Sequence, residues 1–189
     1  VGMINIQITS DFGCRMAAGM LGIEPDEVES LNEVKDLLAE MTNIVGGNVK
    51  SALNDAGFPC VLSTPAITFG SDFTIKSLNM ERYERYGFQH ESETVLMEVG
   101  LKRQGGGEDG AAFDATDISG RLQQADVEKL NSLSYRDRIE AAVIEVFDTM
   151  ISLDIESTDS ISVAGLAGLR NMASVCFGRD ATGIVNIQV

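Results

Sequence analysis

The chain has 189 residues and a strongly acidic composition, with 29 Asp and Glu against 14 Lys and Arg and a formal net charge of −15. This length is enough for one large domain or two small ones with a real hydrophobic core. Nucleic acids and anionic membranes are not expected as partners, because their phosphates would repel the chain. No apolar stretch is long enough to span a bilayer. Three scattered cysteines and the lack of a recognisable secretory signal favour a cytoplasmic location.

The beginning of the chain predicts a strand, a short helix and a long helix, in that order. Residues 3–9 alternate between aliphatic and polar side chains, which is the period-two pattern of a half-buried strand. A short helix is expected to run to Met20, and Gly22 is placed to end it. A longer helix is expected from about Leu31 to Asn54.

The long helix has one apolar face and one polar stripe. Its apolar side chains are Val34, Leu37, Leu38, Met41, Val45, Val49 and Ala52. The stripe consists of Asp36, Glu40, Asn43, Gly47 and Asn54, which fall within about 40° of one another at roughly 100° per residue. The apolar face is wide enough to dock on a core, so the stripe is expected to face outward.

A polar stripe of this kind is ordinarily the solvated face of an amphipathic helix. Two details indicate that this stripe could also contact another molecule. Asn43 lies in the helix interior, where its side chain competes for backbone hydrogen bonds. Gly46 and Gly47 follow at once, although each glycine costs a helix about 0.5–1 kcal/mol relative to alanine. Small residues beside an exposed carboxamide would let another molecule approach closely. The alternative interpretation of the glycines is a local break in the helix.

The pattern D-x3-E-x2-N-x21-P is formed by Asp36, Glu40, Asn43 and Pro65. It resembles the signature of the CheC/CheX/FliY phosphatases, which remove phosphate from the response regulator of bacterial chemotaxis. The segment DLLAEMTNIVGGNVKSALNDAGFPCVLSTP resembles the motif helix of this family and the strand after it. Upstream, GMINIQITSDFGCRMAAGMLG resembles the strand and short helix that precede the motif in CheX. The likeness is specific over most of residues 2–70 and looser beyond them.

This resemblance implies a CheX-like phosphatase that hydrolyses the aspartyl phosphate of a phosphorylated, CheY-like response regulator. Asn43 would orient the attacking water, since a carboxamide donates and accepts hydrogen bonds without titrating. Glu40 would dock beside the active-site lysine of the partner. Asp36 would extend this docking surface or orient Glu40, and Gly47 would belong to the same partner-binding surface. Pro65 would shape the start of the next strand. No cofactor of its own is implied, because the Mg²⁺ is expected on the phosphorylated partner.

Two other functions would use the same stripe differently. It could belong to a non-catalytic adaptor that binds a response regulator or another signalling component without hydrolysis. Glu33, Asp36 and Glu40 could instead hold a divalent metal, although three surface carboxylates more often repel one another than coordinate. The single histidine, His90, lies in a polar stretch typical of a surface residue, and the cysteines lack any metal or redox spacing. No metal site is therefore predicted.

The rest of the chain alternates between strands and helices around one glycine-rich segment. Strands are predicted at 59–69, 73–79, 93–102, 160–167, 172–177 and 183–189, and helices at 125–130 and 135–151. The sequence MERYERYGFQHE fits neither class clearly. Residues 104–120 are acidic, glycine-rich and without period, which predicts a linker. The helix at 135–151 carries no Glu-x-x-Asn, so a single site is expected.

The predicted fold class is α+β and CheX/CheC-like, with an antiparallel-rich sheet, two long helices and pseudo-two-fold symmetry. Residues 1–103 would form the motif-bearing half of a CheX-like domain, 104–120 the linker, and 121–189 the half that completes the same domain. The order is unusual, because the last part resembles the amino-terminal helix and strand of CheX. Ile-Asn-Ile-Gln-Ile near the start also recurs as Val-Asn-Ile-Gln-Val at 185–189. The last part could therefore begin a second repeat, or be exchanged between two chains; CheX-like proteins suggest a homodimer.

Overall fold

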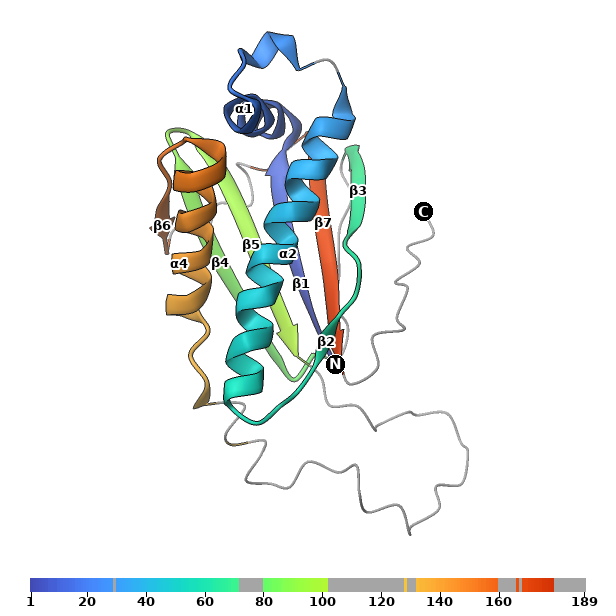
Figure 1. Cartoon of the computed structure of the whole chain (residues 1–189), viewed down its shortest axis with the longest axis vertical. Coiled ribbons are helices and arrows are strands. Elements are labelled where there is room, and N and C mark those ends of the chain that lie inside the picture. The colour runs from blue at the N-terminus through green and yellow to red at the C-terminus, as the bar shows by residue number, and fades with distance from the viewer. Residues whose placement is uncertain are drawn as a thin grey trace, which may run out of the picture.

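A computed structural model describes residues 1–28, 30–71, 80–101, 128, 132–159, 166 and 168–178. These residues form an α+β structure in which helices cover one face of an antiparallel sheet (Figure 1). The predicted strands at 73–79 and 183–189 and the predicted linker lie outside the described residues. Most of the predicted helix at 125–130 and strand at 160–167 also lies outside them.

The sheet brings strands from both ends of the chain together. Its strands are β1 (Gly2–Thr9), β2 (Val61–Leu62), β3 (Ala66–Ser71), β4 (Arg82–His90), β5 (Glu93–Leu101), β6 (Glu156–Thr158) and β7 (Leu169–Gly178). The strand order is β2-β7-β1-β5-β4-β6, and β3 also pairs with β7. Every pairing among the described strands is antiparallel. The segment that fitted neither class therefore supplies β4.

Three α-helices are found in the described part of the chain: α1 (Ser10–Leu21), α2 (Leu31–Asp55) and α4 (Arg136–Val146). A short 3-10 helix, η1 (Pro25–Glu27), lies between the first two, and a π-helical turn, η3 (Phe147–Ile151), continues α4. Thr9 caps the start of α1, and Gly22 ends it in the left-handed region at φ 68°. None of the described helices is both long and apolar enough to cross a membrane.

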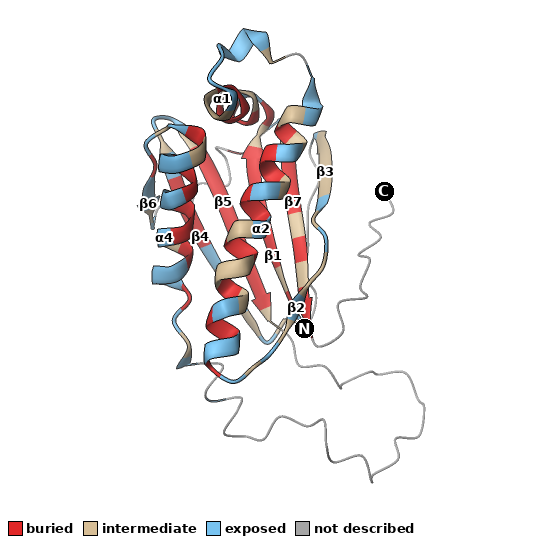
Figure 2. Cartoon of the chain, viewed as in Figure 1, coloured by how far each residue is buried: buried red, intermediate tan, exposed pale blue. Residues whose placement is uncertain are grey.

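The core lies between the sheet and the two helices α2 and α4, which run over the same face (Figures 1 and 2). Along β1, Ile4, Ile6 and Ile8 point into this core and are fully buried. The alternate residues Asn5 and Gln7 point to the other face of the sheet, as the pleat requires, and are also buried. The predicted strand at the start of the chain is confirmed.

The second half of the chain matches the prediction only in its coarse features. Helical residues run from Arg136 to Ile151, but α4 has 11 residues against 25 for α2, and its last part is π-helical. Only α2 is therefore a long α-helix in the described residues. Pseudo-two-fold symmetry stays a prediction. The central place of β7, between β1 and the β2/β3 edge, puts residues from both halves in one sheet.

Candidate functional site

Helix α2 is fixed at its start by a reciprocal cap. The Ser30 hydroxyl accepts a hydrogen bond from the backbone N–H of Asn32 at 3.2 Å, and the Glu33 carboxylate accepts one from the backbone N–H of Ser30 at 3.0 Å. This arrangement is a capping box, which satisfies backbone donors that a helix start otherwise leaves unpaired. Glu33 is therefore occupied in building the helix.

The apolar face of α2 is buried against the sheet as predicted. Its seven predicted core residues, Val34, Leu37, Leu38, Met41, Val45, Val49 and Ala52, are each no more than 6% exposed. Asp36, Glu40 and Asn43 lie on the opposite side and are exposed. Figure 2 shows exposed segments recurring along the side of α2 that faces away from the sheet. The predicted orientation of the helix is confirmed.

The polar residues of α2 differ in what their side chains contact. Asn48 donates a hydrogen bond from Nδ2 to the carbonyl oxygen of Ile44 at 3.0 Å. Asn54 accepts one at Oδ1 from the backbone N–H of Cys60 at 3.2 Å, which ties down the turn after the helix. The sequence placed Asn54 on the same stripe as Asn43, but its carboxamide has a structural task.

By contrast, the side chains of Asp36, Glu40 and Asn43 make no hydrogen bond or ion pair with any other described residue. Asp36 and Glu40 are four residues apart and Asn43 follows three later, so successive members are neighbours on one helix face. We call these three side chains the α2 stripe. Their hydrogen-bonding groups are open to solvent and to any molecule that docks on this face.

The two glycines after the stripe do different things. A Cβ at Gly46 would lie 3.2 Å from Cγ1 of Val175 and 3.4 Å from Cδ1 of Leu62, so the lack of a side chain there lets α2 lie close to the sheet. A Cβ at Gly47 would meet no atom within 4 Å. Only Gly47 leaves free space beside Asn43 on the outer face. The expectation that both glycines open this surface therefore applies to one of them.

Pro65 lies at the edge of the sheet, in the short break between β2 and β3. Before the break, the Ser63 backbone N–H donates to the carbonyl oxygen of Cys176 at 2.8 Å, and the Cys176 N–H donates to the Ser63 hydroxyl at 3.0 Å. Pairing with β7 resumes at Ala66, directly after the proline. A residue without an N–H suits such a break. The predicted strand at 59–69 is thus two strands.

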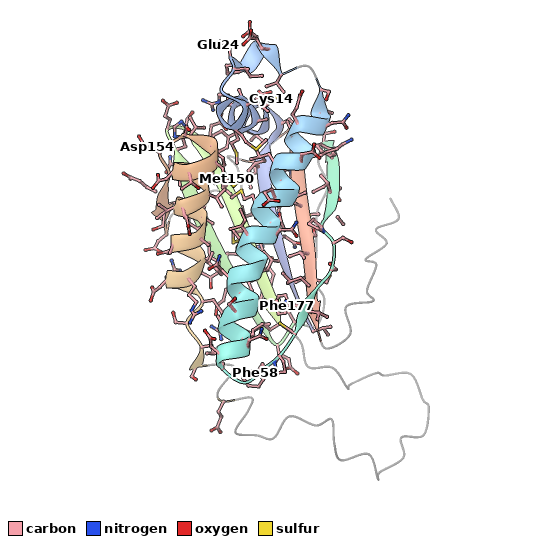
Figure 3. All side chains as sticks on the ribbon, in the orientation of Figure 1. Cys14, Glu24, Phe58, Met150, Asp154 and Phe177 are labelled. Carbon is pink, nitrogen blue, oxygen red and sulfur yellow. The ribbon has the colours of Figure 1, made fainter. Side chains whose placement is uncertain are left out.

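The histidine, cysteine and acidic side chains, which are the usual ligands and nucleophiles in proteins, do not form a metal or nucleophilic site in the described residues. No cluster of three His, Cys, Asp or Glu side chains able to hold a metal ion occurs among the described residues. His90 stacks on Phe12, with ring centroids 5.8 Å apart, and its Nδ1 lies 2.5 Å from the carbonyl oxygen of Asp154, labelled in Figure 3. Burial raises the pKa of all three cysteine thiols, which keeps them protonated at neutral pH.

Residues 1–88 match a family model described as chemotaxis phosphatase CheX. Over these residues the chain is similar to the CheX family. The matched residues contain β1, α1, the whole of α2 and Pro65, so every element of the sequence motif lies within them. No curated protein and no solved structure matched the chain. The family match supports a role like that of a chemotaxis phosphatase in general terms.

Substitution of Gly46 and Gly47 tests directly how α2 packs against the sheet. We expect Gly46→Leu to lower the free energy of unfolding by about 1–3 kcal/mol, because the new side chain must displace Val175 or Leu62. Gly47→Leu makes the same change one residue on, where no atom is near, and should be neutral or stabilising by up to about 1 kcal/mol. Urea denaturation followed by circular dichroism measures both. Equal losses in the two variants would contradict this placement of the helix.

Proposed function

We propose that this chain is a phosphatase that hydrolyses the aspartyl phosphate of a response regulator, with the α2 stripe as its working surface. The proposal rests on the exposure of Asp36, Glu40 and Asn43 and on their lack of hydrogen-bond or ion-pair partners in the described part of the chain. They have no partner among the described residues, yet they are exposed on a helix that is anchored along its whole opposite face. The CheX match over residues 1–88 supports the same class of activity.

Asn43 is the group we assign to the chemistry. Hydrolysis of an acyl phosphate needs a water molecule in line with the scissile bond, and catalysis consists mostly of positioning and electrostatics. The carbonyl oxygen of a carboxamide accepts a hydrogen bond from this water while its N–H group donates to a neighbouring oxygen. Asn43 holds no charge that would repel the phosphoryl oxygens. The Mg²⁺ that neutralises these oxygens would belong to the phosphorylated partner.

Glu40 is the group we assign to docking. An ionised carboxylate accepts hydrogen bonds only, so its natural partner is a lysine or arginine next to the phosphorylated aspartate. Asp36 extends the same acidic surface by one helical turn. The chain as a whole carries a net charge of −15, which gives no long-range attraction toward an acidic phosphoprotein. Recognition would depend on local complementarity at Glu40.

The rigidity of α2 supports this assignment. Its start is held by the cap between Ser30 and Glu33, and its end by the hydrogen bond from Cys60 to Asn54. Arg138 of α4 also pairs with Asp55 at 3.0 Å. A side chain that positions water must itself be held within a narrow range. Gly47 would allow the partner to approach this fixed surface closely.

Two asparagines on α2 make a matched test of the water-positioning role. We expect Asn43→Ala to slow dephosphorylation of the regulator by about 10²-fold without loss of stability, because only the orientation of water is lost. Asn54→Ala should do the opposite. It should lower stability by about 0.5–1.5 kcal/mol by removing the hydrogen bond to Cys60, and leave the rate intact.

The measurement is the decay of a phosphorylated response regulator with Mg²⁺ present, together with urea denaturation of each variant. Accelerated decay that Asn43→Ala abolishes and Asn54→Ala spares supports the phosphatase. Binding of the regulator without any acceleration would instead show a non-catalytic adaptor.

The docking role of Glu40 is tested by removing its charge at nearly constant size. We expect Glu40→Gln to raise KM for the phosphorylated regulator by about 10-fold with a smaller change in kcat, because a charge-assisted contact to the partner is weakened. Glu145→Gln is the control, since Glu145 is exposed on α4 and carries the same charge away from the stripe. If both variants change KM equally, net charge rather than local docking is responsible.

A further inference from the structure

Most of the arginines in the described part of the chain are neutralised by carboxylates of the same chain. The ion pairs are Arg15–Glu93, Arg82–Glu84, Arg85–Glu98, Arg136–Glu140 and Arg138–Asp55. Such pairing is expected where a chain has 29 acidic residues and 14 basic ones. A described cation without a carboxylate beside it is therefore an exception, and its charge is available to another molecule.

Lys35 of α2 is such a cation. Its Nζ donates a hydrogen bond to Oδ1 of Asn32 at 3.2 Å and lies 5.4 Å from the centroid of the Phe69 ring. It makes no ion pair and no other hydrogen bond with the described residues. Because the amide oxygen and the ring are both uncharged, they do not neutralise Lys35. Its ammonium group can donate further hydrogen bonds to an acceptor on another molecule.

The two contacts hold the ammonium group of Lys35 on one side of α2. Phe69 belongs to β3, which lies beside the start of this helix (Figure 1). Lys35 is only partly buried, so another molecule can still reach its side chain. A long side chain that is already positioned loses less conformational entropy when a partner binds it. Lys35 is therefore suited to a contact with a second protein.

The surface around the α2 stripe carries charges of both signs. At roughly 100° per residue, Lys35 lies about 100° around the helix from Asp36 and about 140° from Glu40. The acidic side chains face outward, whereas the positive charge lies on the side of α2 next to β3. On the side next to α4, Arg138 is paired with Asp55 at 3.0 Å. The two sides of the stripe therefore differ in charge.

A phosphorylated response regulator has the kind of surface that such a positive charge would bind. The Mg²⁺ beside an acyl phosphate is held by one or two carboxylates together with phosphoryl oxygens. Acidic groups therefore surround the phosphorylated aspartate of the regulator. They would repel the α2 stripe, which itself carries the carboxylates of Asp36 and Glu40. A positive charge at the edge of the stripe offsets this repulsion.

We propose that Lys35 is a second docking residue, which contacts an acidic side chain of the phosphorylated regulator while Glu40 contacts a basic one. The identity of this partner rests on the function proposed above. Two contacts of opposite sign on different sides of one helix fix the orientation of the bound protein, which a single contact does not. Lys35 would therefore decide which way the regulator lies across α2, and so whether its phosphoryl group reaches Asn43.

The two lysines of α2 give a matched test. Lys50 also has no ion pair with a described residue, but it lies near the other end of the helix and lacks the contacts that hold Lys35. We expect Lys35→Gln to raise Kd for the regulator by about 5-fold, mainly through slower association, and Lys50→Gln to raise it by about 2-fold at most. Lys35→Arg should bind almost as tightly as the unchanged protein, because the charge is kept.

The measurement is surface plasmon resonance with a response regulator from the same organism, held in its activated state by beryllofluoride and Mg²⁺. The difference between the two glutamine variants should shrink as the salt concentration is raised. Equal changes in both variants, or unchanged binding in Lys35→Gln, would overturn the proposal. Binding is measured without hydrolysis, so the phosphatase activity is tested separately. A regulator that binds through Lys35 but is not dephosphorylated would support this contact and refute the phosphatase.

Discussion

The burial of one face of α2 against the sheet is the interaction on which the rest of the structure depends. Fully burying an aliphatic side chain of this size contributes about 1.5–3 kcal/mol, and α2 buries a continuous row of them between Val34 and Ala52. Rotating the helix would move Glu40 toward the core, where an unpaired carboxylate is very costly. The outward direction of the α2 stripe is thus a consequence of hydrophobic packing on the opposite face.

Gly46 and Gly47 are adjacent in the sequence but have different roles in this packing. Gly46 faces Val175 and Leu62 and sets how closely the helix lies on the sheet, whereas Gly47 faces open space beside Asn43. The helix ends are held by Ser30, Glu33 and Asn54, so the middle of the helix can carry side chains without structural partners. Such a surface suits a protein whose proposed catalytic group is an uncharged carboxamide acting on the phosphate of another molecule.

Much of this arrangement could be predicted from the sequence, because it follows from local periodicity. The 3.6-residue pattern gave the bounds and orientation of α2, and Gly22 marked the end of α1. Features that depend on distant residues could not be predicted in the same way. The role of Gly46 depends on Val175 and Leu62, and the structural role of Asn54 depends on its hydrogen bond with the backbone N–H of Cys60. Strand β4 could not be assigned from the sequence because it contains charged residues such as Arg85. In the structure Arg85 pairs with Glu98 on the neighbouring strand at 3.1 Å.

The central claim is that a phosphorylated response regulator docks on the α2 stripe, and a structure of that complex tests it most directly. The regulator can be held in its activated state by beryllofluoride, which mimics the acyl phosphate. The account predicts that the Asn43 carboxamide reaches the position of the attacking water, in line with the aspartyl group, and that Glu40 contacts a basic side chain beside it. A complex in which the regulator binds another face and leaves Asn43 in solvent would contradict the account.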